Sequence, residues 1–250
     1  MQAQRLPAAR GFSWLTEGYA LFRRNPPLLT LLTLGYLLIV LAVGMLQPFG
    51  PFLLPLLLPT LTTLVANGCR ALDLGLSRQA LTSGLAEQRG PLLRLGILHL
   101  AGTLAVLAID LLLEGGGWSA LDRGMNPETV NLAQMLRLML IASPLLLAFW
   151  FAPLLTAWDR VPAAKSLFFS FVAAWRNWRA FLAYGAAVML IGVFLPGLLL
   201  IGATLLSATL GDILSMVLRL LLVLVFAPVL MASVYLSYRD VFVPPPTAHG

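Results

Sequence analysis

Long apolar runs alternate with short polar or basic segments along the whole chain. Six of these runs are long enough to cross a bilayer, because a spanning helix needs about 20 predominantly apolar residues. Charged residues or clusters of Gly and Pro bound each run. The predicted spans lie near residues 27–46, 51–69, 91–113, 132–157, 180–209 and 212–238. This pattern predicts an all-α, polytopic membrane protein with one domain over residues 1–243.

The segments between the spans differ in length. QPFGP at 47–51 and SATLGD at 207–212 contain turn-forming residues, so each is predicted to be a tight turn at a hairpin tip. Residues 114–131 are predicted to be a longer, solvated loop with Trp118 at the membrane interface. The Pro-rich residues 244–250 are predicted to be a disordered tail.

Composition excludes several classes of protein. Of the 250 residues, 60% are hydrophobic and 10% are charged, and the mean hydropathy is +0.91. Soluble domains carry about 25% charged residues, so a large soluble domain is excluded. The net charge is +6, but the basic residues lie beside apolar runs. The predicted partner is therefore a bilayer containing anionic lipids, and no nucleic acid is expected.

The basic residues also predict an orientation. If the N-terminus lies in the cytoplasm, 13 of the 16 Lys and Arg residues fall in cytoplasmic segments, whereas Arg123 lies in an outer loop. The positive-inside rule therefore predicts six spans with both termini in the cytoplasm. Six arginines beside the spans are candidate contacts for anionic lipids or for a membrane-protein partner: Arg23, Arg24, Arg89, Arg94, Arg176 and Arg179.

The segments before the odd-numbered spans resemble one another. SWLTEGYALFRRNPPLL at 13–29 aligns without gaps with SLFFSFVAAWRNWRAFL at 166–182, which pairs Arg23 with Arg176. ALTSGLAEQRGPLL at 80–93 is a weaker third copy. In the first copy, Phe12, Leu15, Tyr19 and Phe22 have helical spacing. An amphipathic helix in the membrane interface is therefore predicted before each odd-numbered span.

The even-numbered spans also share a pattern. Each contains a proline followed by a similar run that ends in Arg: LPTLTTLVANGCR at 58–70, APLLTAWDR at 152–160 and APVLMASVYLSYR at 227–239. A proline inside a span is tolerated where neighbouring groups satisfy the carbonyl that it frees. We therefore predict three pseudo-repeated units, each an interfacial helix plus a helical hairpin, packed around a common centre.

Ionisable residues inside a bilayer are functional candidates because they are costly to bury. Asp110 and Arg137 each lie about one turn (about four residues) from the outer ends of adjacent antiparallel spans. An ion pair is therefore predicted, while a site for a substrate charge and two independent interfacial side chains remain alternatives. Arg219 lies about two turns into the last span. It can reach outer water, pair with Asp212 or Glu114, or bind an anionic head group.

The remaining reactive residues give little chemistry. His99 has no second histidine nearby, so we interpret it as a packing residue. Cys69 is the single cysteine; it excludes an intramolecular disulfide and is interpreted as a small buried hydrophobe. Motifs such as HExxH, GxSxG and the Walker loop are absent from the sequence. No catalytic, cofactor-binding or metal-binding residue is predicted.

Two segments carry a resemblance to known proteins: RGFSWLTEGYALFRRNPPLL at 10–29 and SYRDVF at 237–242. Through them the chain resembles a family of small six-helix inner-membrane proteins of proteobacteria, mostly of unknown function. It is also similar in plan to the membrane domain found beside some glycerophosphodiester phosphodiesterases, although no phosphodiesterase catalytic domain is present. The resemblance implies a six-helix topology in a bacterial inner membrane and no active-site residues.

The sequence thus predicts a non-enzymatic inner-membrane protein that engages membrane partners or anionic lipids through basic interfacial helices. The alternative is a small transporter or lipid-handling protein with a polar site near Asp110, Arg137 and Arg219. The first hypothesis predicts a close-packed centre. The second predicts a hydrated or lipid-filled cavity lined by these three residues.

Overall fold

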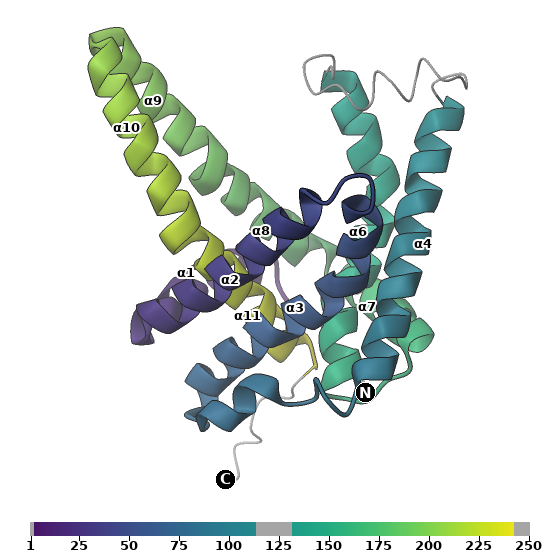
Figure 1. Cartoon of the computed structure of the whole chain (residues 1–250). Coiled ribbons are helices and arrows are strands. Elements are labelled where there is room, and N and C mark those ends of the chain that lie inside the picture. Colours follow the sequence, from purple (N-terminus) through teal and green to yellow (C-terminus); the bar gives the residue numbers. More distant parts are fainter. Residues whose placement is uncertain (1–2, 114–131, 243–250) are drawn as a thin grey trace.

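The computed structural model describes residues 3–113 and 132–242, and its core is a set of helices long and apolar enough to cross a membrane (Figure 1). Six such helices occur in the described part of the chain, which confirms the predicted number of spans. Four are single helices and two are composite. They are α2 (Pro26–Gly44), α3 (Gly50–Leu74), α4 (Arg89–Leu113), α6 (Leu132–Ala157), α8–η3–α9 (Trp178–Met189, Leu190–Phe194 and Leu195–Leu206) and α10–η4–α11 (Ala208–Leu221, Leu222–Phe226 and Ala227–Phe242).

Two predicted connections can be compared with the structure. The turn at 47–51 is present, because α2 ends at Gly44 and α3 begins at Gly50. The turn predicted at 207–212 is much shorter: Ser207 alone is extended, and α10 begins at the next residue. The predicted loop at 114–131 and the predicted tail at 244–250 lie outside the described residues.

Short helices precede the first and third hairpins. These are α1 (Ala9–Arg24) and α7 (Ala163–Arg176). The middle segment differs from the prediction, because it contains only the 3-10 helix η1 (Arg78–Thr82) and turns before α4 begins. Gly84 lies in the left-handed region at φ 75°, and a side chain there would approach the main-chain oxygen of Ala157 to 2.5 Å. This close approach fits a folded-back loop but no α-helix.

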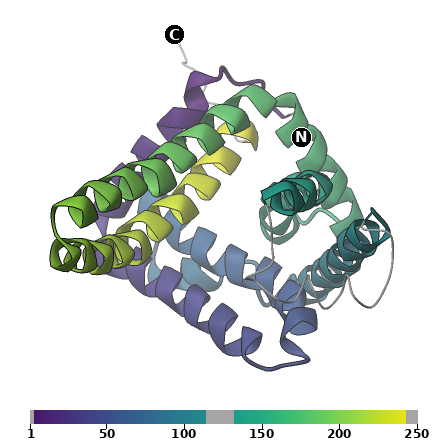
Figure 2. The same cartoon turned by 90° about the horizontal axis from the view of Figure 1, so that it is seen from above.

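Seen from above, three hairpins surround a common centre (Figure 2). They are α2–α3, α4–α6 and the pair made by the two composite spans. Figure 1 shows that the hairpins diverge: the arm formed by α9 and α10 leans away from α4 and α6. The two ends of the described part of the chain meet on one side, where the Gln4 N–H donates to the Val241 carbonyl at 2.9 Å. We call this side the basic end, because it carries α1, η1, α7 and the six candidate arginines.

The closest helix packing lies at the basic end. Helix α1 enters between α8 and α11 and contacts both. Gly11 permits this approach, because a Cβ there would lie 1.9 Å from the main-chain oxygen of Ala180 in α8. At Gly18, two turns further, a Cβ would lie 2.9 Å from the Val229 oxygen in α11. Trp14 lies between these glycines and is fully buried. Small residues therefore seat α1 in the bundle.

The prolines leave carbonyls without their usual helical partner, as the sequence predicts. Pro228 frees the Leu224 carbonyl, which accepts a hydrogen bond from the Thr30 hydroxyl of α2 at 3.0 Å. Pro144 frees the Leu140 carbonyl, which accepts from Ser143 at 2.8 Å.

In α3, Pro55 and Pro59 lie inside the helix. Helix α3 nevertheless runs unbroken from Gly50 to Leu74, so its three prolines do not divide it. In α6, the Ser170 hydroxyl of α7 donates to the Leu147 carbonyl at 2.8 Å and accepts from the Phe151 N–H at 2.9 Å. Polar partners for two of these proline-containing spans, α11 and α6, therefore come from a neighbouring hairpin or its leading helix.

Candidate functional site

A network of three arginines and three carboxylates joins α1, α3 and α11 at the basic end. Arg10 of α1 binds Glu17 at 2.7 Å and also Asp240 of α11. Arg239 binds Asp73 of α3 and Glu17, both at 3.1 Å. We call Arg10, Glu17, Arg24, Asp73, Arg239 and Asp240 the ion network.

The ion network is balanced in charge, with three members of each sign, so it does not itself form a site for an extra ion. The Trp14 indole donates to Asp240 at 3.0 Å and the Tyr235 hydroxyl donates to Asp73 at 2.9 Å. The carboxylates beside Arg10 raise the pKa of its guanidinium, although burial acts in the opposite direction. Arg24, predicted as a lipid contact, lies 3.7 Å from Asp73 and is partly engaged here. The network therefore acts as a clamp between helices.

A second polar group lies beside the ion network, where α6 ends. Asp159 accepts a hydrogen bond from the Tyr238 hydroxyl of α11. Burial raises the pKa of the Asp159 carboxyl, while the Tyr238 hydrogen bond and the Arg70 charge act against this shift. The Arg70 guanidinium lies 4.9 Å from the centre of the Trp158 ring, and the Trp158 indole donates to Asn67 at 2.8 Å. These contacts hold the ends of α3, α6 and α11 together.

The corner where α7 meets α8 exposes aromatic and basic side chains together. Phe168 and Trp175 are 64% and 63% exposed, and Trp178 is 53% exposed. Arg176 and Arg179 are also exposed, and the Arg179 guanidinium lies 5.5 Å from the centre of the Trp178 ring. The opposite side of α7 buries small residues, among them Ser166, Ser170, Ala173 and Ala174. This helix therefore presents its large apolar side chains outward.

The other candidate arginines at the basic end are also exposed. Arg23 lies in the last turn of α1, with its guanidinium 5.9 Å from the centre of the Tyr19 ring. Arg89 and Arg94 lie at the start of α4. Within residues 3–113 and 132–242, none of Arg23, Arg89, Arg94, Arg176 and Arg179 forms an ion pair. Five of the six candidates are thus available to an anion from outside the chain.

Two of the three predicted intramembrane residues meet. Arg137 Nε of α6 lies 2.7 Å from Asp110 Oδ1 of α4, which confirms the predicted ion pair. Arg219 is not brought to this pair, because it lies on the divergent α9–α10 arm (Figures 1 and 2). Arg219 is exposed and does not pair with Asp212. Glu114, its other predicted partner, lies outside the described residues. The predicted three-residue site is therefore not assembled.

His99 and Cys69 take packing positions. His99 stacks on Phe149 with ring centres 4.3 Å apart, and it borders a cavity of about 290 Å³ that Tyr36 and Thr62 also line. Cys69 is fully buried, as predicted. The described part of the chain contains no group of three or more His, Cys, Asp or Glu side chains that could hold a metal ion.

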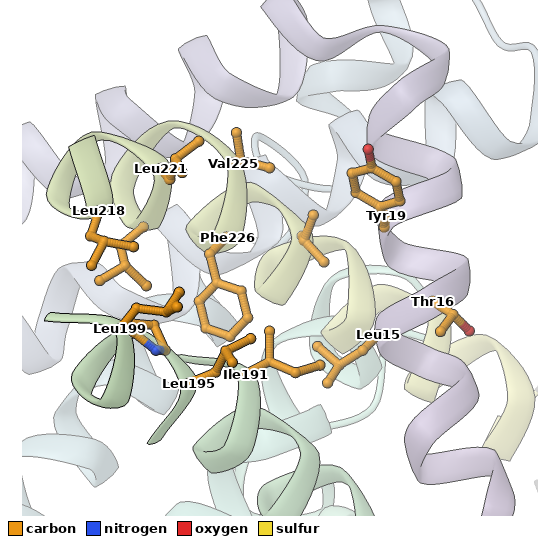
Figure 3. Close-up of a pocket in the computed structure, with 13 residues that line it drawn as sticks. Leu15, Thr16, Tyr19, Ile191, Leu195, Leu199, Leu218, Leu221, Val225 and Phe226 are labelled. Carbon is orange, nitrogen blue, oxygen red and sulfur yellow. The ribbon is translucent and has the colours of Figure 1, made fainter. Parts of the chain in front are cut away.

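An apolar groove of about 500 Å³ lies between α1 and the two composite spans (Figure 3). Leu15, Thr16 and Tyr19 of α1 line one wall. The other walls come from the segments around η3 and η4, the two π-helical turns. Phe226 points into the groove and packs on Gly192, where a Cβ would approach its ring to 2.6 Å. The groove opens outward, because Leu199 and Leu221 in its walls are about half exposed.

Sequence reasoning missed the ion network, the groove and Asn177. Asn177 is fully buried between α7 and α8; it accepts from the Leu6 N–H at 2.8 Å and donates to the Gln4 carbonyl at 2.9 Å. In the alignment of residues 13–29 with 166–182, Asn177 pairs with Arg24, which directly precedes Asn25. An asparagine near this position in both copies was a weak sequence signal of a helix break. The network had no such signal, because its members lie far apart in sequence.

The six long apolar helices in the described part of the chain define an all-helical integral membrane protein. The chain is 35% identical over 203 residues to the Probable inner membrane protein BTH_II0599 of Burkholderia thailandensis, a match that covers 74% of each chain. The chain therefore belongs to the family of this probable inner membrane protein. No family model and no solved structure matches it. The similarity to the membrane domain beside glycerophosphodiester phosphodiesterases gains no support from these comparisons and stays a prediction.

Proposed function

We propose that this protein binds anionic phospholipids at its basic end, in a non-enzymatic role in the inner membrane. The observation that carries the proposal is the corner of α7 and α8, where exposed Phe168, Trp175 and Trp178 lie beside exposed Arg176 and Arg179. Aromatic side chains favour the boundary between acyl chains and head groups, and arginine binds phosphate in a forked geometry. Such a corner suits the surface of a bilayer better than contact with water.

Charge balance supports the choice of an anionic lipid. The ion network satisfies its own charges, whereas Arg176 and Arg179 have no acidic partner in the described residues. Each basic residue near an anionic membrane surface contributes about 1 kcal/mol. Two such residues give a preference for anionic over zwitterionic lipid that can be measured.

The proposed organisation is three pseudo-repeated units. Arg23 and Arg176 align, and each lies at or next to the end of a short helix that leads into a span. Thr30 of the first unit contacts the proline-containing span of the third, and Gly96 of the second packs against the Leu56 backbone in that of the first. Ser170 of the third contacts that of the second. This cyclic order supports units that pack around a centre, with α1 and α7 as interfacial helices and η1 as a reduced counterpart.

The proposed orientation places the basic end in the cytoplasm, as the positive-inside rule predicts. A reporter that is active only outside the cytoplasm, fused after Phe242, tests it. The reporter is expected to be inactive there and active when inserted into the loop at 114–131. The reverse pattern would overturn the orientation.

The lipid proposal is tested by counting bound lipids. The delipidated protein in detergent is titrated with phosphatidylglycerol or phosphatidylcholine and examined by native mass spectrometry. The wild type is expected to bind phosphatidylglycerol more tightly. The double variant Arg176→Gln/Arg179→Gln is expected to lose about 2 kcal/mol, roughly thirtyfold in affinity.

The matched control is Arg5→Gln/Arg160→Gln, which removes two exposed charges from the same end but leaves the corner intact. Equal binding of the two lipids by the wild type, or an equal loss in the control, would contradict the proposal. A protein that copurifies in a fixed ratio with the wild type but not with Arg176→Gln/Arg179→Gln would instead assign the corner to a protein partner.

A further inference from the structure

The groove between α1 and the composite spans has walls suited to a hydrocarbon chain. Thr16 and Tyr19, both on α1, are the lining residues with polar side-chain atoms. The Thr16 hydroxyl already donates to the Ser13 carbonyl at 3.0 Å. The rest of the lining is aliphatic or aromatic, as at Leu195, Leu218 and Phe226 (Figure 3). A polar solute that entered the groove would lose hydrogen bonds to water and find few replacements, whereas a hydrocarbon chain has no hydrogen bonds to lose.

The shape of the bundle keeps this groove open. Helix α1 separates α8 from α11 at the basic end, while α9 and α10 contact each other at the opposite end. Between these two contacts each composite span contains a π-helical turn, η3 or η4, and both turns border the groove. Turns of this kind disturb regular packing and frequently occur at functional sites. The groove thus runs from α1 into the spanning part of the protein.

One end of the groove carries a positive charge. Tyr19 lines that end, and the guanidinium of Arg23 lies 5.9 Å from the centre of its ring. Arg23 is exposed and forms no ion pair with the described residues, whereas Arg24 beside it lies 3.7 Å from Asp73. An anion held at Arg23 would therefore lie next to the mouth of an apolar groove.

We propose that the groove binds one acyl chain of an anionic phospholipid whose phosphate contacts Arg23. A long hydrocarbon attached to an anion satisfies both features at once. The inference rests on the proposed function for the class of lipid. It adds a specific site on α1, separate from the corner of α7 and α8.

The test uses phosphatidylglycerol with a photoreactive diazirine in the acyl chain, incorporated with the full-length protein into nanodiscs. After illumination, peptide mapping is expected to find crosslinks on the groove walls near Leu199 and Leu218. The variant Leu199→Trp fills the groove from a half-exposed position, so the fold is expected to survive. It is expected to lower crosslinking there about tenfold, equivalent to about 1.4 kcal/mol.

The matched control is Leu205→Trp, the same substitution two turns away on α9, at a position that is 82% exposed and does not line the groove. It should leave the crosslink yield unchanged. Arg23→Gln should keep crosslinking but abolish the preference for phosphatidylglycerol over phosphatidylcholine carrying the same diazirine. This readout separates the head-group contact from the chain site.

Two outcomes in the groove variants would overturn the inference: unchanged groove crosslinks in Leu199→Trp, or an equal loss in Leu205→Trp. A third is an unchanged lipid preference in Arg23→Gln. The proposed function is judged separately through Arg176→Gln/Arg179→Gln, which leaves the groove intact. Failure of the groove with a positive result at the corner therefore rejects only the chain site.

Discussion

The basic half of the molecule and the opposite half pack differently. At the basic end, α1 lies against the backbones of α8 and α11, and Trp14, Leu154 and Asn177 are fully buried. Toward the opposite end the hairpins diverge (Figures 1 and 2), and leucines such as Leu205 and Leu112 face outward.

The difference follows from the bilayer as a solvent. Lipid tails are as apolar as leucine, so leucine-rich surfaces gain little by leaving lipid for one another. Close association in a membrane needs small residues or polar bonds between helices. The basic half has both, in Gly11, Gly18, Asn177 and the ion network. Stability should therefore be concentrated there, and substitutions in the two halves should have unequal effects.

The largest effect is expected from Gly11→Ala. The added methyl group would meet the Ala180 oxygen, and a backbone atom cannot rotate away. We expect a loss of about 3 kcal/mol or more in unfolding free energy, measured by detergent-based denaturation. Gly35→Ala is the control, because its Cβ would meet nothing within 4 Å. It should change stability by less than about 1 kcal/mol. Similar losses in the two variants would refute the close packing of α1.

Asn177→Ala should cost about 2 to 3 kcal/mol, because it leaves the Leu6 N–H and the Gln4 carbonyl without their partner. The comparison is Asn25→Ala, whose side chain accepts one hydrogen bond from the Leu28 N–H at an exposed helix start. That change should cost about 1 kcal/mol. Thermal unfolding followed by size-exclusion chromatography measures both. An Asn177→Ala variant as stable as the wild type would show that the hydrogen bonds of Asn177 do not stabilise the fold.

A smaller effect is expected in the opposite half, at the Asp110–Arg137 pair, whose side chains are partly buried. Asp110→Leu removes a partner of Arg137 and should cost about 1 to 3 kcal/mol. The double variant Asp110→Leu/Arg137→Leu removes both charges and should be more stable than the single variant. Denaturation in matched detergent compares them. Equal stability of the single and double variants would argue against an energetic coupling between the two residues.

The smallest effect is expected at Leu205, which is 82% exposed. Leu205→Ala should change unfolding free energy by no more than about 0.5 kcal/mol. Leu154→Ala makes the same chemical change at a fully buried position of the basic half and should cost about 2 to 5 kcal/mol. A loss at Leu205 equal to that at Leu154 would show that the divergent arm is covered by something other than lipid.

The sequence alone determined the number of spans and that each span is helical. In lipid, a stretch of apolar residues must make its backbone hydrogen bonds internally, so it forms a helix. The length of the stretch and the charges beside it indicate where this helix crosses the membrane. Asp110 and Arg137 lie at similar distances from the outer ends of their spans. Because these spans are antiparallel neighbours, the sequence predicted that the two residues lie at the same depth and form a pair. The prolines likewise predicted that freed carbonyls need polar partners, and Thr30 supplies one to the Leu224 carbonyl.

The tertiary structure alone decided which helices meet and which diverge. Arg219, like Arg137, is an arginine inside a predicted span, yet it lies on the divergent arm (Figure 1). The hydropathy of a span does not show which side of its helix faces a neighbour. The ion network joins Arg10 and Glu17 to Arg239 and Asp240, which are more than 200 positions away. The groove exists because α1 separates α8 from α11 while α9 and α10 stay in contact. Length and charge fix what crosses the membrane, but the placement of small residues decides how closely the crossing helices pack.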